Sequence, residues 1–273
     1  MPTITADDGT QLQYEQHGPH DNVPRNADVV LLAGFRAPGT SWRYQVPALL
    51  AAGHRVTVVD LRGHGASDPS PTGTTMATRA SDLDAVLRHL HLRDVVLVGG
   101  SMGASTVWAF VQQFGEERVR AIVSVDQTPR MLNGEGWEHG FYGYSDANRD
   151  TFFAETIPST GVGTPMWRRP ARVLRMLRAM QGVSRELGPG DLGVLNDHAK
   201  ADWRPVIAGF SKPVLFVAGA ESEYWPSEHA AASAALAPQG TSATVQRAGH
   251  ATNLEQPKAV NAGLLDFIAR LPR

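Results

Sequence analysis

Residues 94–114 read DVVLVGGSMGASTVWAFVQQF, in which a glycine-rich turn separates two apolar stretches. The run Asp94–Val98 predicts a buried strand, and Met102–Phe114 predicts a helix. The letters between them, GGSMG, fit the pattern G-x-S-x-G with Ser101 at its centre. In a strand–turn–helix arrangement of this kind the serine lies on a tight turn, where small neighbours let the two backbones approach. Ser101 is therefore a candidate nucleophile, and a glycine-rich turn with an incidental serine is the alternative.

Strands and helices alternate through most of the rest of the chain. Continuous apolar runs predict further buried strands at 28–34, 55–60, 119–125, 213–218 and 243–246. Apolar residues at helical spacing predict helices at 44–52, 81–92 and 260–271. Two short extended segments, 3–6 and 11–15, are joined through Asp8-Gly9, which is typical of a hairpin. The alternation predicts an α/β fold with a mostly parallel sheet and helices on both faces.

The stretch from about Pro129 to Pro205 interrupts this alternation. It shows no clear strand, it is rich in aromatic residues and methionine, and Arg168–Met180 has helical spacing. We predict that residues 130–205 form a helical cap over the ends of the strands, where open parallel sheets bind ligands. The core then consists of residues 1–129 and 206–273. Ordinary packing between helices is the alternative.

Three tryptophans are candidates for an apolar substrate pocket. Trp137 and Trp167 lie in the predicted cap, and Trp225 follows the predicted strand 213–218. Large aromatic side chains commonly line small-molecule sites. Packing of the cap against the core explains the same residues equally well.

A serine hydroxyl needs a general base to become nucleophilic at neutral pH. The best candidate is His250, which lies in a loop after the last predicted strand and before the last predicted helix. A loop at the carboxyl end of a strand reaches a neighbouring catalytic turn in folds of this kind. The rival His64 lies between two glycines, in the sequence RGHG at 62–65, and we expect it to have a role in that turn.

A carboxylate should hold the imidazole in the correct tautomer and stabilise its protonated form. Asp126 directly follows the predicted strand 119–125, whereas Glu221 and Glu223 follow the strand 213–218. We favour Asp126, because a short acid at the end of a strand is better fixed than a longer side chain in a loop. The two glutamates remain alternatives.

Composition excludes several classes of protein. The chain of 273 residues has 25 basic and 27 acidic side chains, a net charge of −2, without the basic excess of a nucleic-acid-binding protein. It has no cysteine, which excludes disulfides, thiolate metal sites and a cysteine nucleophile. The sequence shows no histidine cluster of zinc-site type, no secretory signal and no apolar run of the roughly 20 residues that span a bilayer.

We therefore expect a cytoplasmic protein without a metal, a membrane partner or a nucleic-acid partner. Its partner should be a small molecule with apolar or aromatic character. The sequence leaves the oligomeric state open, with a homodimer as one option.

Four segments together resemble the α/β-hydrolase superfamily, namely LLAGF at 31–35, DLRGHGAS at 60–67, GGSMG at 99–103 and Gly249-His250. The similarity extends from about residue 3 to residue 271 and is least specific in the cap. The order serine, acid, histidine agrees with that of the family. The resemblance implies an eight-stranded, mostly parallel sheet under a helical lid. It also implies that the backbone amides of Phe35 and Met102 form an oxyanion hole.

The sequence departs from the family pattern at two positions. Many members have a histidine before the glycine where this chain has Ala33-Gly34, so an ordering role of that histidine is missing here. Many members also place an aspartate three residues after a glycine that follows the seventh strand. Counted from Gly219, that position is Ser222, which is a second reason to favour Asp126 as the acid.

The expected function is that of a serine hydrolase which cleaves a carboxylic ester or lactone of a hydrophobic small molecule through an acyl-enzyme. Ser101 attacks, His250 transfers the proton and Asp126 orients His250, with no cofactor. The resemblance leaves alternatives on the same fold. These are a cofactor-independent dioxygenase that cleaves a hydroxyquinolone ring with the His250–Asp126 pair, a lyase, a perhydrolase, and a non-catalytic receptor for a small ligand.

Overall fold

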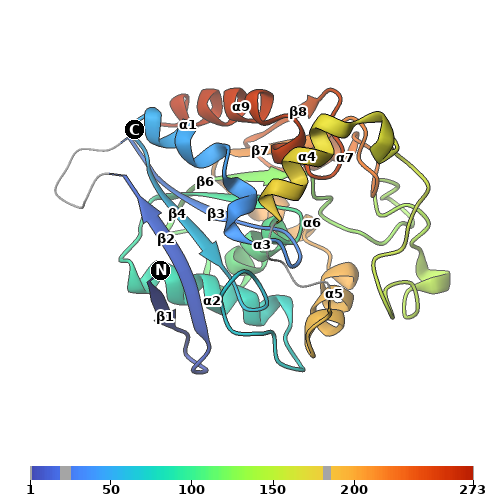
Figure 1. Cartoon of the computed structure of the whole chain (residues 1–273), viewed down its shortest axis with the longest axis horizontal. Coiled ribbons are helices and arrows are strands. Elements are labelled where there is room, and N and C mark those ends of the chain that lie inside the picture. The colour runs from blue at the N-terminus through green and yellow to red at the C-terminus, as the bar shows by residue number, and fades with distance from the viewer. Residues whose placement is uncertain (1, 19–25, 181–185, 273) are drawn as a thin grey trace.

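A central sheet organises the computed structural model of the chain, which describes residues 2–18, 26–180 and 186–272. Within these residues eight strands pair in the order β1-β2-β4-β3-β5-β6-β7-β8 (Figure 1). Their bounds are Thr3–Thr5 (β1), Gln11–His17 (β2), Asp28–Leu32 (β3), Arg55–Asp60 (β4), Val95–Gly100 (β5), Val119–Val125 (β6), Val214–Gly219 (β7) and Gly240–Val245 (β8). Strand β2 runs antiparallel to both of its neighbours, β1 and β4, and the other neighbouring strands are parallel. The predicted eight-stranded, mostly parallel sheet is confirmed.

Both faces of the sheet are covered, as the continuous apolar runs predict. Every residue of β3 is buried, and successive side chains enter different hydrophobic clusters. Val30 and Leu32 belong to one cluster, whereas Val29 and Leu31 belong to the other. This alternation follows from the two-residue period of a strand, which turns neighbouring side chains to opposite faces.

Helices form the outer layers. Their bounds are Gln45–Ala51 (α1), Met76–His89 (α2), Met102–Phe114 (α3), Pro170–Ala179 (α4), Asp191–Lys200 (α5), Arg204–Gly209 (α6), His229–Leu236 (α7), Thr252–Glu255 (α8) and Pro257–Ala269 (α9). Buried residues of α1 and α9 join the cluster on one face, and those of α2, α3, α6 and α7 join the other (Figure 1). None of the helices in the described residues is long and apolar enough to cross a membrane.

The helix expected at 81–92 differs from the observed α2, which begins at Met76 and ends at His89. Thr75 caps its first turn, because the Thr75 hydroxyl accepts the backbone N–H of Thr78 at 3.2 Å and the Thr78 hydroxyl accepts that of Thr75. The apolar spacing after Ser81 locates the buried face of the helix but not its start. The pair of threonines at 75 and 78 was the sequence signal that marks the start of this helix.

The chain leaves the sheet after β6 and returns to it at β7. Helices α4, α5 and α6 lie in the intervening segment, which bridges back on itself between Arg130 and Asp202. Helix α4 packs against α8, the short helix that follows the loop of His250. Part of the predicted cap therefore lies beside the predicted catalytic loop.

Candidate active site

Ser101 occupies the turn between β5 and α3 in a conformation that side chains rarely adopt. Its φ is 50° and its ψ is −128°, which costs free energy unless the surroundings enforce it. Two glycines of the turn make this enforcement possible. A Cβ atom on Gly99 would collide with the backbone of Ala104, and one on Gly103 would collide with the backbone of Leu32. The pattern G-x-S-x-G thus has a direct steric reason here.

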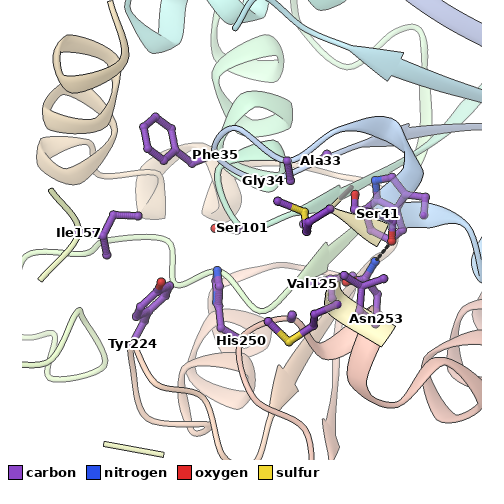
Figure 2. A pocket seen from close by; sticks show the side chains of 17 residues that line it. Ala33, Gly34, Phe35, Ser41, Ser101, Val125, Ile157, Tyr224, His250 and Asn253 are labelled. Carbon is purple, nitrogen blue, oxygen red and sulfur yellow. Dashed lines mark hydrogen bonds between the residues drawn. The ribbon is translucent and has the colours of Figure 1, made fainter. Parts of the chain in front are cut away.

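Ser101 and His250 line the same cavity of about 210 Å³ (Figure 2). Its wall is largely apolar, with Ile157, Met176 and Met180 contributed by the segment between β6 and β7. Figure 2 shows a ring nitrogen of His250 directed toward Ser101. No hydrogen bond joins these two side chains in the described part of the chain. Such contacts are often long in ligand-free active sites and shorten when the substrate binds.

The carboxylate of Asp126 holds the other side of the His250 ring. His250 Nδ1 lies 2.8 Å from Asp126 Oδ2. Asp126 follows β6 with a φ of 46°, and its side chain is fully buried. Its Oδ1 accepts the backbone N–H of Gly219 at 2.7 Å, and its Oδ2 accepts the hydroxyl of Ser222 at 2.7 Å. Of the candidate acids, Asp126 is the one that contacts the imidazole.

The two glutamates that compete with Asp126 have other partners. Glu223 accepts the backbone N–H of His250 at 2.7 Å, and Glu221 pairs with Arg172 at 2.9 Å. Glu223 therefore contacts the loop of His250 rather than its ring.

The charge of Asp126 determines the tautomer of His250. Burial acts to raise the pKa of Asp126, but the imidazoles of His229 and His250 outweigh it and lower this pKa to about 2. The carboxylate is then ionised at neutral pH and accepts a proton-bearing Nδ1. The remaining ring nitrogen of His250 is left as the acceptor that a general base needs.

The predicted oxyanion-hole residues Phe35 and Met102 are both close to Ser101 along the chain or across the cavity. Met102 is the first residue of α3, where the amide has no partner within the helix. Phe35 lines the cavity and follows Gly34, whose added Cβ would be 3.0 Å from Ser101 Cβ. Neither amide donates a hydrogen bond to another described residue. Both remain candidates for the oxyanion hole.

The three predicted pocket tryptophans are absent from the wall of this cavity, so that prediction is corrected. Trp137 is buried and donates its indole N–H to the carbonyl of Arg130 at 3.0 Å. Trp167 is 74% exposed, and Trp225 packs behind His250 with ring centroids 5.2 Å apart. The aromatic wall consists of Phe35, Trp42 and Tyr224 instead.

His64 lies away from the cavity wall. It is buried, and its Nε2 accepts the backbone N–H of Arg36 at 3.3 Å and lies 3.2 Å from Arg79 Nη1. Burial, with the charges of these arginines, lowers the pKa of His64 well below its usual range. A neutral, buried imidazole that supports a loop fits the structural role expected for this histidine.

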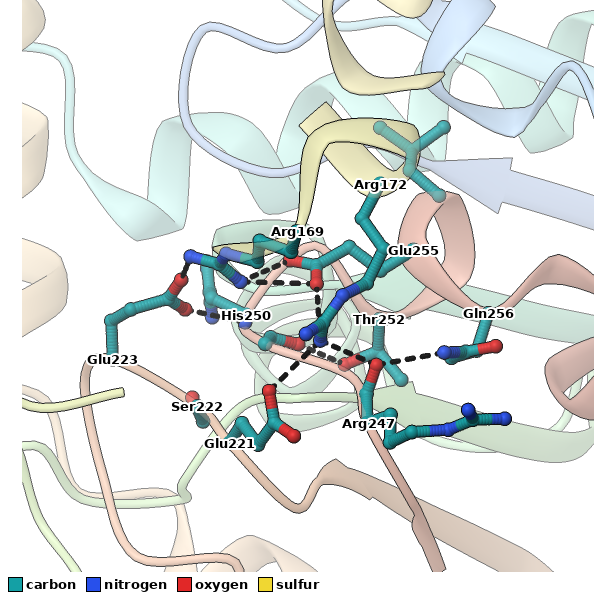
Figure 3. A network of polar contacts seen from close by, with 12 residues as sticks. Arg169, Arg172, Glu221, Ser222, Glu223, Arg247, His250, Thr252, Glu255 and Gln256 are labelled. Atoms are coloured by element: carbon teal, nitrogen blue, oxygen red, sulfur yellow. Dashed lines mark hydrogen bonds and ion pairs between the residues drawn. The ribbon is translucent and has the colours of Figure 1, made fainter. Parts of the chain in front are cut away.

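A network of ion pairs connects α4 to the loop of His250 (Figure 3). Arg169 pairs with Glu223 and, at 2.8 Å, with Glu255. Arg172 pairs with Glu255 at 3.2 Å. Sequence reasoning missed this network, and the signal was the three-residue spacing of arginines at 169, 172 and 175, which brings them onto one side of a helix.

Comparison with known proteins shows the family and the fold. The sequence profile of the α/β hydrolase fold family matches residues 29–257. A non-heme chloroperoxidase of Streptomyces lividans is 30% identical over an alignment that covers 98% of this chain and 99% of the relative. A bifunctional esterase/perhydrolase of Acinetobacter calcoaceticus is 24% identical over 98% of this chain and 99% of its own length. The crystal structure of a bromoperoxidase from Bacillus anthracis matches with a TM-score of 0.79 and 27% identity over 98% of this chain and 100% of that chain. The chain therefore belongs to the α/β hydrolase fold family.

Proposed function

We propose that this α/β hydrolase cleaves a carboxylic ester or lactone of an apolar small molecule through an acyl-enzyme on Ser101. The observation that carries the proposal is the 2.8 Å contact between Asp126 and His250, in a cavity that His250 shares with Ser101. Nucleophile, base and orienting acid are the three roles that acyl transfer requires.

The first half-reaction forms the ester between substrate and enzyme. His250 accepts the proton of the Ser101 hydroxyl while the oxygen attacks the substrate carbonyl. The amides of Phe35 and Met102 donate to the oxyanion of the tetrahedral intermediate, and each donor of this kind contributes about 3 kcal/mol. The intermediate collapses, the bond to the leaving alcohol breaks, and protonated His250 gives its proton to that alcohol.

The second half-reaction restores the enzyme. Water attacks the acyl carbonyl as His250 accepts its proton, and the carboxylic acid leaves as Ser101 is protonated again. The perhydrolase name of the Acinetobacter relative is compatible with the same acyl-enzyme, because hydrogen peroxide can replace water as the attacking molecule. The apolar cavity wall supports an acyl or ring portion without charge.

A second candidate uses the His250–Asp126 pair alone to deprotonate a substrate, as in a cofactor-independent dioxygenase or a lyase. One observation favours it. The hydrogen bond between His250 and Asp126 is formed, whereas no hydrogen bond joins His250 to Ser101 in the described residues. In this candidate Ser101 is dispensable.

Ser101→Ala separates the two candidates. We expect a fluorophosphonate probe to label Ser101 in the wild-type protein, and Ser101→Ala to lose labelling and at least about 10³-fold of ester turnover. The matched control is Ser105→Ala in α3, the helix that follows Ser101, because Ser105 is buried and outside the cavity wall. Ester turnover that survives Ser101→Ala and disappears in His250→Ala would contradict the acyl-enzyme and support proton abstraction. A panel of aryl esters, lactones and a hydroxyquinolone, with oxygen uptake recorded, covers both chemistries.

A further inference from the structure

Asp126 faces a second imidazole besides that of His250. His229, the first residue of α7, is 1% exposed. Its Nε2 lies 3.7 Å from Asp126 Oδ1, beyond hydrogen-bond length but close enough for a charge interaction. Neither ring nitrogen of His229 has a hydrogen-bond partner in the described part of the chain. Burial of an imidazole without hydrogen-bond partners costs free energy. The position of His229 beside a carboxylate therefore needs an explanation.

Trp225 packs against both imidazoles. Its ring meets His229 at a centroid distance of 6.0 Å and an angle of 76°, and it meets His250 at 5.2 Å and 81°. The carboxylate of Asp126 contacts both histidines as well, with Oδ1 toward His229 and Oδ2 toward His250. The two rings thus share one anion and one aromatic neighbour.

Among the charged groups around His229, Asp126 is the nearest anion. Helix α7 packs mainly against α6, β7 and β8, and the two strands carry no titratable side chain. The charged residue of α6, Arg204, pairs with Asp202 at 2.6 Å. Glu228 precedes His229 on the chain, and burial together with the charges of Glu228 and Asp126 raises the pKa of Tyr142 nearby.

We propose that His229 is a positioning residue that shares the Asp126 carboxylate with His250 and sets the pH range in which His250 acts as a base. The role of His250 as a base rests on the proposed function. A neutral His229 with its proton on Nε2 points a donor at Oδ1 and helps to fix the carboxylate. A protonated His229 places positive charge beside Asp126 and disfavours a proton on His250. The shared carboxylate thus links the charge of one imidazole to the charge of the other.

The test replaces His229 with glutamine, which keeps a neutral polar group but cannot titrate. The rate of fluorophosphonate labelling of Ser101 is measured from pH 5 to 9. We expect the acid side of the wild-type profile to be broader than a one-proton curve. In His229→Gln it should become a one-proton curve displaced to higher pH by about half a unit, because no second cation competes with His250. His54→Gln is the control, since His54 is buried before β4, far from the carboxyl ends of the strands, and the wild-type curve should persist.

Titration of the ring ¹⁵N resonances of His250 gives a readout that does not depend on catalysis. The wild-type protein should show two steps for His250, and His229→Gln should show one. Absence of labelling in the wild type would overturn the proposed hydrolase function, while the ¹⁵N titration would still test the coupling. If His229→Gln and His229→Phe change thermal stability but leave the titration of His250 unchanged, His229 is a packing residue and the inference is wrong.

Discussion

Asp126 and Ser222 follow two neighbouring strands, β6 and β7, at the edge of the sheet where His250 lies. Asp126 follows β6 and holds the ring, while Ser222 follows β7 and donates its hydroxyl to Asp126 at 2.7 Å. Position 222 is where the family pattern described above has an aspartate, and here Ser222 contacts the same oxygen, Asp126 Oδ2, that His250 contacts. In this chain the carboxylate therefore follows β6, and a hydrogen-bonding hydroxyl occupies the position after β7.

This arrangement predicts a rescue. Asp126→Asn should lower kcat/KM for an aryl ester by about 10³ to 10⁴-fold, because the amide no longer stabilises the protonated imidazole. The double variant Asp126→Asn with Ser222→Asp returns a carboxylate beside His250 and should recover at least about tenfold of that loss. Ester kinetics, normalised to the fraction of Ser101 that a fluorophosphonate labels, measure both effects. A double variant no more active than Asp126→Asn would show that the Ser222 position cannot support the ring.

The candidate site residues could be predicted because each follows the carboxyl end of a strand. Ser101 follows β5, Asp126 follows β6, and His250 lies in the loop between β8 and α8, so the register of the parallel strands brings them together. The cavity wall could not be predicted in this way. Met176 and Trp42 reach it from α4 and from a short 3-10 turn, and their placement depends on packing between segments distant in sequence.

At the scale of elements, ion pairs and hydrogen bonds of arginine side chains connect α4 to α8. Arg169 and Glu255 are 5% and 1% exposed, so both charges are removed from water. Burial raises the pKa of Glu255, and the positive charge of Arg169 opposes this shift. Arg175 adds two hydrogen bonds to the backbone of α8, to the carbonyls of Leu254 at 3.0 Å and Glu255 at 2.6 Å.

Replacing Arg169 should therefore destabilise the folded protein. Arg169→Met leaves buried carboxylates without their main partner and should lower the free energy of unfolding by about 3 kcal/mol. The control is Arg270→Met, because Arg270 and its partner Asp266 are 77% and 58% exposed, and its effect should stay below about 0.5 kcal/mol. Urea denaturation measures both values. Equal effects of the two substitutions would show that the network contributes no more than a surface pair.

Helices and strands with a clear pattern of apolar residues could be predicted from the sequence. The bounds of α3 and β6 are those that the sequence predicts, and β4 also agrees residue for residue. Helices α5 to α8 were missed, since they are short, of four to ten residues, and none of the four has a side-chain cap at its start. Their helical form depends on tertiary contacts that no local pattern encodes.

At the scale of the whole molecule, buried histidines connect stability to pH. His54, His64 and His198 are each at most 5% exposed. Burial lowers the pKa of all three, that of His198 to about 3. They lie in different parts of the fold, before β4, after β4 and in α5. Each of them stays neutral in the folded chain while the unfolded chain takes up a proton.

The sign of the resulting pH dependence follows from linkage. Between pH 6.5, the ordinary pKa of histidine, and about pH 3, the unfolded state binds a proton that folded His198 does not bind. Stability is therefore greatest above this range and falls as the pH falls, by up to about 1.4 kcal/mol per pH unit for each such histidine. Asp126 acts in the same direction at lower pH, because its pKa of about 2 lies below the ordinary value of 3.8.

We predict that the free energy of unfolding falls steeply between pH 6.5 and pH 5. In His198→Gln the slope of this fall should be smaller, because about one proton fewer is taken up on unfolding. Glutamine is neutral at every pH, so the variant loses the linkage of that histidine whatever the substitution costs at pH 7.5. Urea denaturation at pH 7.5, 6.0 and 5.0 gives the slopes, and His89→Gln, at an exposed position, should retain the wild-type slope. Identical slopes for the wild type and His198→Gln would mean that folded His198 takes up its proton as readily as the unfolded chain does, which its burial in the protein should prevent.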